Sequence, residues 1–191
     1  MPKIAIALAG LETIKDKDGH PKYFAETFMN NTKTWKKDNK ALPVKLIDCR
    51  DYREMASPMT ALWADLEDIS AQNGLDVLMI SCHSDWEGLY LFSKYRKELS
   101  EDDRYITLVR SWSGIKFNPG AAIYLHGCQA GGRFGKKWPE CIAQTISNSA
   151  KVKVYAYASR SSQRLRKDGG YWQKPDIGGF IEFTPKELAQ E

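Results

Sequence analysis

Two residues in this 191-residue sequence have side chains and positions suited to nucleophilic catalysis. His83 follows the apolar run 76–82 (DVLMISC), and Cys128 comes shortly after the apolar run 121–125 (AAIYL). Each run has the length and composition of a strand that is buried on both faces. Ligands of open α/β sheets bind beyond the carboxyl ends of the strands. We therefore expect His83 and Cys128 to face each other at that edge.

The chemistry that this pair would support is acyl transfer through a thiolate. A cysteine needs a neighbouring imidazole or a helix N-terminus to lower its pKa, and a base to handle protons. Gly131 and Gly132 would let backbone amides approach a developing oxyanion, and the helix predicted after them would point its positive end at the site. From the residues alone, two interpretations stay open: a catalytic dyad of His83 and Cys128, or a core cysteine near a hydrogen-bonded histidine.

The elements that must position these residues alternate between strands and helices. Apolar blocks predict strands at 3–8, 44–49, 76–82, 121–125 and 151–158, an edge strand at 179–183, and a small hairpin at 88–92. Helical spacing and end signals predict helices at 24–38, 58–73 and 136–147. Alternation of this kind implies right-handed crossovers. The fold class is therefore α/β, a three-layer sandwich with a mainly parallel sheet of about six strands.

Length and composition bound the organisation of the chain. With 42% hydrophobic residues, the chain can bury one sizeable core, so we expect one domain over residues 1–191, with 161–178 as a long mobile loop. No apolar run is long enough to cross a bilayer, and MPKIAIALAG fits a first strand better than a signal peptide. These patterns predict a soluble, cytoplasmic protein with no membrane partner.

The four cysteines fit reduced thiols better than a disulfide framework, and Cys49, Cys82 and Cys141 are expected to be buried and free. Strand alternation should turn Cys82 to the face opposite His83. The cysteine and histidine spacings match no zinc site, and the glycines of GCQAGGRFG match no nucleotide fingerprint. We therefore predict no metal and no cofactor. A net charge of +4 gives little reason to expect nucleic acid.

Three stretches of the sequence resemble the caspase-like clan of cysteine peptidases. VLMISCHS (77–84) is similar to the family's strand that ends in the catalytic histidine, and AIYLHGCQAGG (122–132) is similar to the strand that ends in the nucleophile. VKVYAYAS (152–159) resembles the strand after the nucleophile helix. The closest likeness is to bacterial caspase-like domains of large surface proteins. The resemblance implies a caspase/hemoglobinase-like central sheet.

Carried over position by position, the resemblance makes His83 the catalytic base and Cys128 the nucleophile, with the amide of Cys128 in the oxyanion hole. The family usually has glycine directly after the histidine, whereas this chain has Ser84 and reaches a glycine only at Gly88. Ser84 and Gly88 are therefore the candidates for the second oxyanion donor. That departure leaves the second donor open.

The resemblance also implies where the substrate would bind. In the clan, the residue two before the nucleophile and the strand after it shape the pocket for the side chain that precedes the cleaved bond. The matching positions here are His126, Tyr157, Ser159 and Arg160. The clan commonly has an acidic or amide residue at the position of His126, so no substrate preference carries over, and a structural role for His126 is an alternative.

These inferences lead to a cysteine endopeptidase that uses a His-Cys dyad and a thioester acyl-enzyme to cleave protein or peptide substrates. The alternative is a non-catalytic caspase-like binding domain, which the serine at position 84 favours. The resemblance to caspases, which pair through an edge strand, implies that the edge strand at 179–183 would pair two copies of the chain into a homo-oligomer.

Overall fold

The structure, a computed structural model, describes residues 5–10, 13–15, 21–23, 25–40, 43–84, 88–92, 106–107, 110–127, 130–131, 141–157, 161–165, 171–175 and 180–186. For 13–15, 21–23, 25–27, 161–165, 171–175 and 180 it describes the backbone alone. Among the predicted site residues, Cys128, Ser159 and Arg160 lie outside these ranges, as does Gly132.

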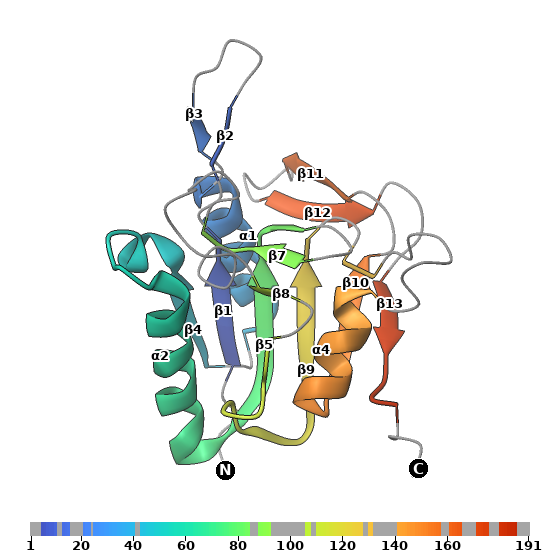
Figure 1. The fold of residues 1–191 in the computed structure, drawn as a ribbon. Coiled ribbons are helices and arrows are strands. Elements are labelled where there is room, and N and C mark those ends of the chain that lie inside the picture. The colour runs from blue at the N-terminus through green and yellow to red at the C-terminus, as the bar shows by residue number, and fades with distance from the viewer. Residues whose placement is uncertain are drawn as a thin grey trace.

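A six-stranded sheet forms the centre of the fold (Figure 1). Its strands lie in the order β13 (Phe180–Phe183), β10 (Lys153–Tyr157), β9 (Phe117–His126), β5 (Leu75–Ser81), β1 (Ala5–Ala9) and β4 (Val44–Asp48). Neighbouring strands are parallel except for β13, which pairs antiparallel with β10 at the edge. The α/β class and the mainly parallel six-stranded sheet are therefore as predicted.

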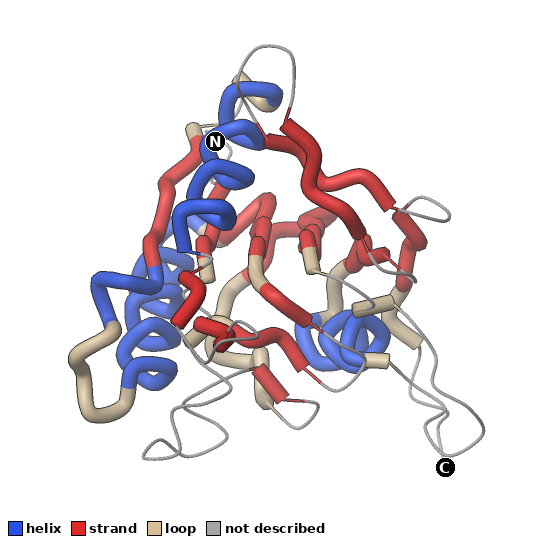
Figure 2. The backbone as a smooth tube through the Cα atoms, turned by 90° about the horizontal axis from the view of Figure 1, so that it is seen from above, coloured by secondary structure: helices blue, strands red, loops and turns tan. Residues whose placement is uncertain are grey.

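Helices cover both faces of this sheet (Figures 1 and 2). Helix α1 (Ala25–Asp38) lies on one face, and α2 (Pro58–Asn73) and α4 (Ile142–Ala150) lie on the other. Strand β1 shows how the sequence produces this arrangement, because Ile6 and Leu8 belong to the core that includes α2 and α4, whereas its alanines face α1. The small alanine side chains let α1 pack closely on the sheet.

Helix α2 begins and ends where the local signals predict. Ser57 occupies the N-cap position and Pro58 the first turn, although the Ser57 side chain makes no capping hydrogen bond. Gly74 ends the helix with φ 71° and donates its N–H to the Ser70 carbonyl at 2.7 Å. A side chain at Gly74 would also overlap that of Asn118, so both φ and space require glycine there.

Three small sheets accompany the main one. Strand β7 (Gly88–Tyr90) pairs antiparallel with β6 (His83–Ser84) and with β8 (Ile106–Thr107). The stretch 88–92, predicted as a hairpin by itself, therefore contributes one strand of this sheet. Strands β2 (Thr13–Lys15) and β3 (Pro21–Tyr23) form a hairpin between β1 and α1, and a 3-10 helix, η1 (Cys49–Tyr52), follows β4.

One prediction needs correction. Residues 161–178 were expected to form a loop, but β11 (Ser161–Leu165) and β12 (Tyr171–Pro175) pair antiparallel within it. Figures 1 and 2 show this hairpin on the same side of the sheet as α1, near the carboxyl ends of the central strands, and β12 contacts α1. The backbones of the two strands pair over five residue pairs, from Ser161 opposite Pro175 to Leu165 opposite Tyr171.

The remaining elements agree with the predictions apart from their bounds. The predicted strand at 121–125 extends from Phe117 to His126, and the described part of the helix predicted at 136–147 runs over Ile142–Ala150. Within the described residues, every helix is too short or too polar to traverse a lipid bilayer.

Candidate active site

The predicted histidine and the predicted nucleophile each follow, in the sequence, the carboxyl end of one of two neighbouring strands, β5 and β9. The two strands are parallel neighbours, and their last aligned pair is Ser81 opposite His126. His83 follows Ser81 by two residues, and Cys128 follows His126 by two residues. His83 and Cys128 are therefore each two residues beyond the aligned pair Ser81 and His126.

Gly127, at the end of β9, packs directly against the two residues on either side of His83. A Cβ atom at position 127 would overlap the Ser84 hydroxyl and would lie 2.7 Å from Ser84 Cβ and 3.2 Å from the Cys82 carbonyl oxygen. Ser84 is itself buried, so it has little room to move. Glycine is required at position 127 because only a bare backbone fits against the residues that flank His83.

His83 is held by its backbone and by one aromatic contact. It pairs with Tyr90 across the β6–β7 ladder, and its ring meets the Phe28 ring edge to face, with centroids 5.2 Å apart and an interplanar angle of 89°. Burial lowers the pKa of His83 below its usual value of 6.5. The imidazole is therefore neutral at pH 7, which is the form that can accept a proton from a thiol.

Cys82 and His83 point to opposite faces of the sheet, as strand alternation predicts. Cys82 is 2% exposed and belongs to the core that includes α2, whereas His83 contacts Phe28 of α1. Cys49 and Cys141 are also buried and free, so the expectation for these three cysteines is confirmed. Burial, followed by the charges of Asp48 and Asp51, raises the pKa of the Cys49 thiol and keeps it protonated.

Polar contacts beneath His83 fix the end of β5. Asn31 of α1 donates from Nδ2 to the Ser81 hydroxyl at 3.2 Å, and both residues are buried. The Ser81 carbonyl accepts the Gly10 N–H at 2.8 Å, which joins the ends of β1 and β5. These hydrogen bonds tie the end of β5, the strand before His83, to α1 and to the end of β1.

The chain beyond Cys128 is fixed again at Ala130 and Gly131. The Ala130 carbonyl accepts the N–H of Ala143 in the first turn of α4 at 3.1 Å, and the Gly131 N–H donates to the Tyr157 carbonyl at 2.9 Å. The Gly131 N–H is therefore engaged within the fold and is not itself available to an oxyanion. A Cβ at Gly131 would lie 2.9 Å from the Phe183 ring, so this glycine serves packing between β10 and β13.

The structure brings together two of the four predicted pocket residues. The rings of His126 and Tyr157 meet edge to face with centroids 6.2 Å apart, at the ends of adjacent strands. Burial lowers the pKa of His126 to about 4 and raises that of Tyr157 to about 12. Both side chains are therefore uncharged at neutral pH, and Ser159 and Arg160 lie outside the described residues.

The two candidates for the second oxyanion donor lie in different strands. Ser84 packs directly against Gly127, whereas Gly88 lies in the next strand, β7, opposite Thr107 of β8. Of these two candidates, Ser84 is therefore the one that lies against the end of β9. Among the described residues, no group of three or more His, Cys, Asp or Glu side chains could hold a metal ion.

Sequence reasoning missed two site residues, Phe28 and Asn31 of α1, as neighbours of His83 and Ser81. Helical spacing predicted the helix at 24–38, but it does not say which strand end the buried face of that helix meets.

Comparisons with known proteins complete the description of the site. No protein-family model matches the chain, and no curated protein sequence matches it.

Proposed function

We propose that this chain is a cysteine peptidase related to the caspase-like clan, with His83 as the base and Cys128 as the nucleophile. The observation that carries the proposal is the register of β5 and β9, in which Ser81 lies opposite His126. Each of the two proposed catalytic residues follows that pair by two positions.

The packing of Gly127 supports the same pairing. Its Cα lies against Ser84 and the Cys82 carbonyl, on either side of His83 in the chain. Consecutive Cα atoms are about 3.8 Å apart, so the peptide bond to Cys128 starts beside the histidine.

The proposed reaction proceeds in two steps. Neutral His83 accepts the proton of the Cys128 thiol, and the sulfur attacks a peptide carbonyl carbon to form a tetrahedral oxyanion, stabilised by the amide of Cys128. The His83 imidazolium then gives its proton to the leaving amine as the C–N bond breaks, which leaves a thioester. Water, deprotonated by His83, hydrolyses the thioester and restores the thiol.

The substrate would be a polypeptide whose residue before the cleaved bond lies near His126 and Tyr157. Because His126 is uncharged above its pKa of about 4, it gives this pocket no positive charge at neutral pH. His126 and Tyr157 are both uncharged at neutral pH, so they provide no charge that would select an acidic residue before the cleaved bond.

A second candidate is a non-catalytic binding domain of the same fold. Ser84 favours it, because its buried side chain occupies the place where the clan has glycine and where Gly127 approaches. In that case the carboxyl edge of the sheet would hold a polypeptide without cleaving it.

The test uses a library of unfolded peptides and identifies cleavage products by mass spectrometry. The parent and Cys82→Ala are expected to cleave the same bonds, and Cys128→Ala none, because Cys82 faces the core on the side opposite His83. Cleavage that persists in Cys128→Ala rules out the proposed nucleophile. Peptides that bind to the parent and stay intact identify the binding domain instead.

A further inference from the structure

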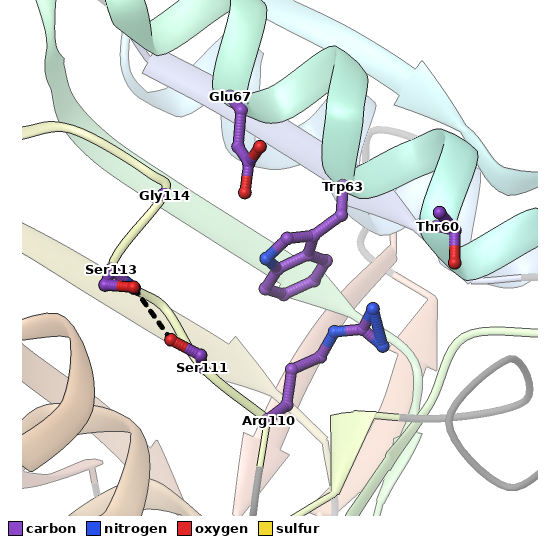
Figure 3. Close-up of a pocket in the computed structure, with 7 residues that line it drawn as sticks. All are labelled: Thr60, Trp63, Glu67, Arg110, Ser111, Ser113 and Gly114. Atoms are coloured by element: carbon purple, nitrogen blue, oxygen red, sulfur yellow. Dashed lines mark hydrogen bonds between the residues drawn. The ribbon is translucent and has the colours of Figure 1, made fainter.

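A second site lies on the face of the sheet that α2 covers, away from the carboxyl edge. A pocket of about 580 Å³ opens between α2 and the segment that precedes β9 (Figure 3). Trp63 and Glu67 come from α2, and Arg110, Ser111 and Ser113 come from the segment. The volume falls in the range of small-ligand sites.

The indole of Trp63 forms one wall of this pocket and has an unused hydrogen-bond donor. Trp63 is 7% exposed, and its Nε1–H is buried without a hydrogen-bond partner among the described residues. Figure 3 shows the nitrogen turned toward Glu67, Gly114 and Ser113. A buried N–H that lacks an acceptor costs free energy, and a ligand oxygen that displaces the side chain covering it would recover that free energy.

The Trp63 ring is fixed in place, so the donor has a defined direction. Trp112 meets it edge to face with centroids 4.9 Å apart, and the Arg110 guanidinium lies 4.6 Å from the ring centroid. The Ser111 and Ser113 hydroxyls are joined by a 2.9 Å hydrogen bond, which stiffens the segment opposite the indole. A rigid donor favours a ligand whose acceptor has a fixed position.

Glu67 places an acceptor beside this donor. Its carboxylate lies over Gly114, where a Cβ atom would overlap Glu67 Oε1, so glycine at 114 makes room for the carboxylate. Glu67 is half-buried, and its flexible side chain extends from the surface of α2. The pocket therefore presents an N–H donor and a carboxylate acceptor next to each other.

That combination selects the ligand. A carboxylate ligand would meet the Trp63 donor but would be repelled by Glu67, and an ammonium group would meet Glu67 but not the indole N–H. A neutral amide satisfies both, because its carbonyl oxygen accepts from Trp63 Nε1–H while its N–H donates to the Glu67 carboxylate. The peptide backbone is the polymer that repeats this pair of groups.

We infer that this pocket binds the backbone of an extended peptide segment, with one amide held between Trp63 and Glu67. The inference does not depend on the proposed peptidase activity, because none of these residues belongs to the site at His83.

The test follows the indole N–H signals of the protein by ¹H–¹⁵N NMR during titration with N-acetylglycine N-methylamide, a single peptide unit. The chain has six tryptophans, and Trp63→Phe assigns the signal of Trp63. The Trp63 signal is expected to shift saturably with this probe. Acetate, which lacks the N–H, and uridine, which offers a similar donor and acceptor on a nucleobase, are expected to bind at least about tenfold more weakly.

Two variants test the assigned contacts. Glu67→Gln replaces a charged acceptor by a neutral one and is expected to weaken binding of the probe about tenfold. Glu182→Gln, which removes an exposed carboxylate on β13, is the matched control and should leave the affinity unchanged. Any shift that the probe causes in the indole N–H signal of the neighbouring Trp112 should disappear in Trp63→Phe.

The inference is overturned by a Trp63 signal that does not shift saturably with the peptide unit, by equal affinity for acetate, or by tighter binding of uridine. It is also overturned if Glu67→Gln and Glu182→Gln bind the probe equally well. Where Trp63→Phe fails to fold, the two glutamate variants decide the outcome, because neither side chain is part of the core.

Discussion

Gly127→Ala is expected to destabilise the protein through a steric conflict at the candidate active site. The added Cβ would lie 2.7 Å from Ser84 Cβ, where carbon atoms in contact are normally about 3.5–4.0 Å apart. It would also overlap the Ser84 hydroxyl. Gly127 does not have a positive φ, so alanine meets no conformational penalty of the left-handed region and the cost is one of packing.

The size of the effect follows from this conflict. Forcing a methyl group into a packed core costs about 1–3 kcal/mol, and Ser84 is buried on a short strand that cannot move freely. We expect the free energy of unfolding to fall by about 2 kcal/mol. In a domain of this size, that lowers the melting temperature by about 4–8 °C.

Urea denaturation of a double-mutant cycle isolates the contact. Ser84→Gly removes both atoms that the new Cβ would strike, so in the Gly127→Ala background it should restore stability, with a coupling energy of at least about 1 kcal/mol. Gly120→Ala is the matched control. Its φ of 79° makes alanine unfavourable, but no atom lies within 4 Å, so Ser84→Gly should not rescue it.

The reasoning is refuted if the costs of Gly127→Ala and Ser84→Gly simply add. Additivity would mean that the end of β9 does not pack against the residue after His83. The juxtaposition that supports the proposed dyad would then lose its structural basis.

Three further predictions concern the surroundings of the site. Because burial lowers the pKa of His126 from 6.5 to about 4, the unfolded chain binds this proton first as the pH falls. His126 should therefore contribute about 2–3 kcal/mol to the stability that the parent loses between pH 6.5 and pH 4. In urea unfolding, His126→Gln should lose that much less than the parent over this range, and equal losses would contradict the shift. Asn31→Ala should lower the free energy of unfolding by about 1–2 kcal/mol, because it leaves the buried Ser81 hydroxyl without its donor. The double variant with Ser81→Ala should lose less stability than the sum of the single changes, and additive losses in chemical denaturation would disprove the coupling. Ala7→Leu should cost about 1–3 kcal/mol in the same assay, because Ala7 is fully buried on the α1 face of β1; a neutral change would show that α1 can move away from the sheet.

Local signals were sufficient where one short stretch of sequence decides the structure. The apolar runs before His83 and Cys128 predicted two neighbouring parallel strands, and Pro58 and Gly74 marked the ends of α2. Alternation alone placed Cys82 and His83 on opposite faces. These features depend on strand period, helix ends and backbone dihedrals, which residues close together in the sequence determine.

The sequence was insufficient where the structure depends on distant partners. Strands β11 and β12 pair with each other, and neither shows a regular alternation of apolar and polar residues. Hydrophobic periodicity therefore did not predict this hairpin. Gly131 resembled a residue of an oxyanion loop, but its role depends on Phe183, 52 positions later (183 minus 131). The contact between Phe28 and His83 likewise depends on how α1 crosses the sheet, which helical spacing leaves undetermined.

The most direct test of the proposed dyad is the rate of iodoacetamide labelling at each cysteine against pH, located by mass spectrometry, in the parent and in His83→Ala. Buried Cys49, Cys82 and Cys141 should stay unlabelled in the folded protein and serve as internal controls. If His83 activates Cys128, this thiol should react at pH 7 at least about tenfold faster in the parent than in His83→Ala. Equal rates at Cys128 in the two proteins would contradict the proposal.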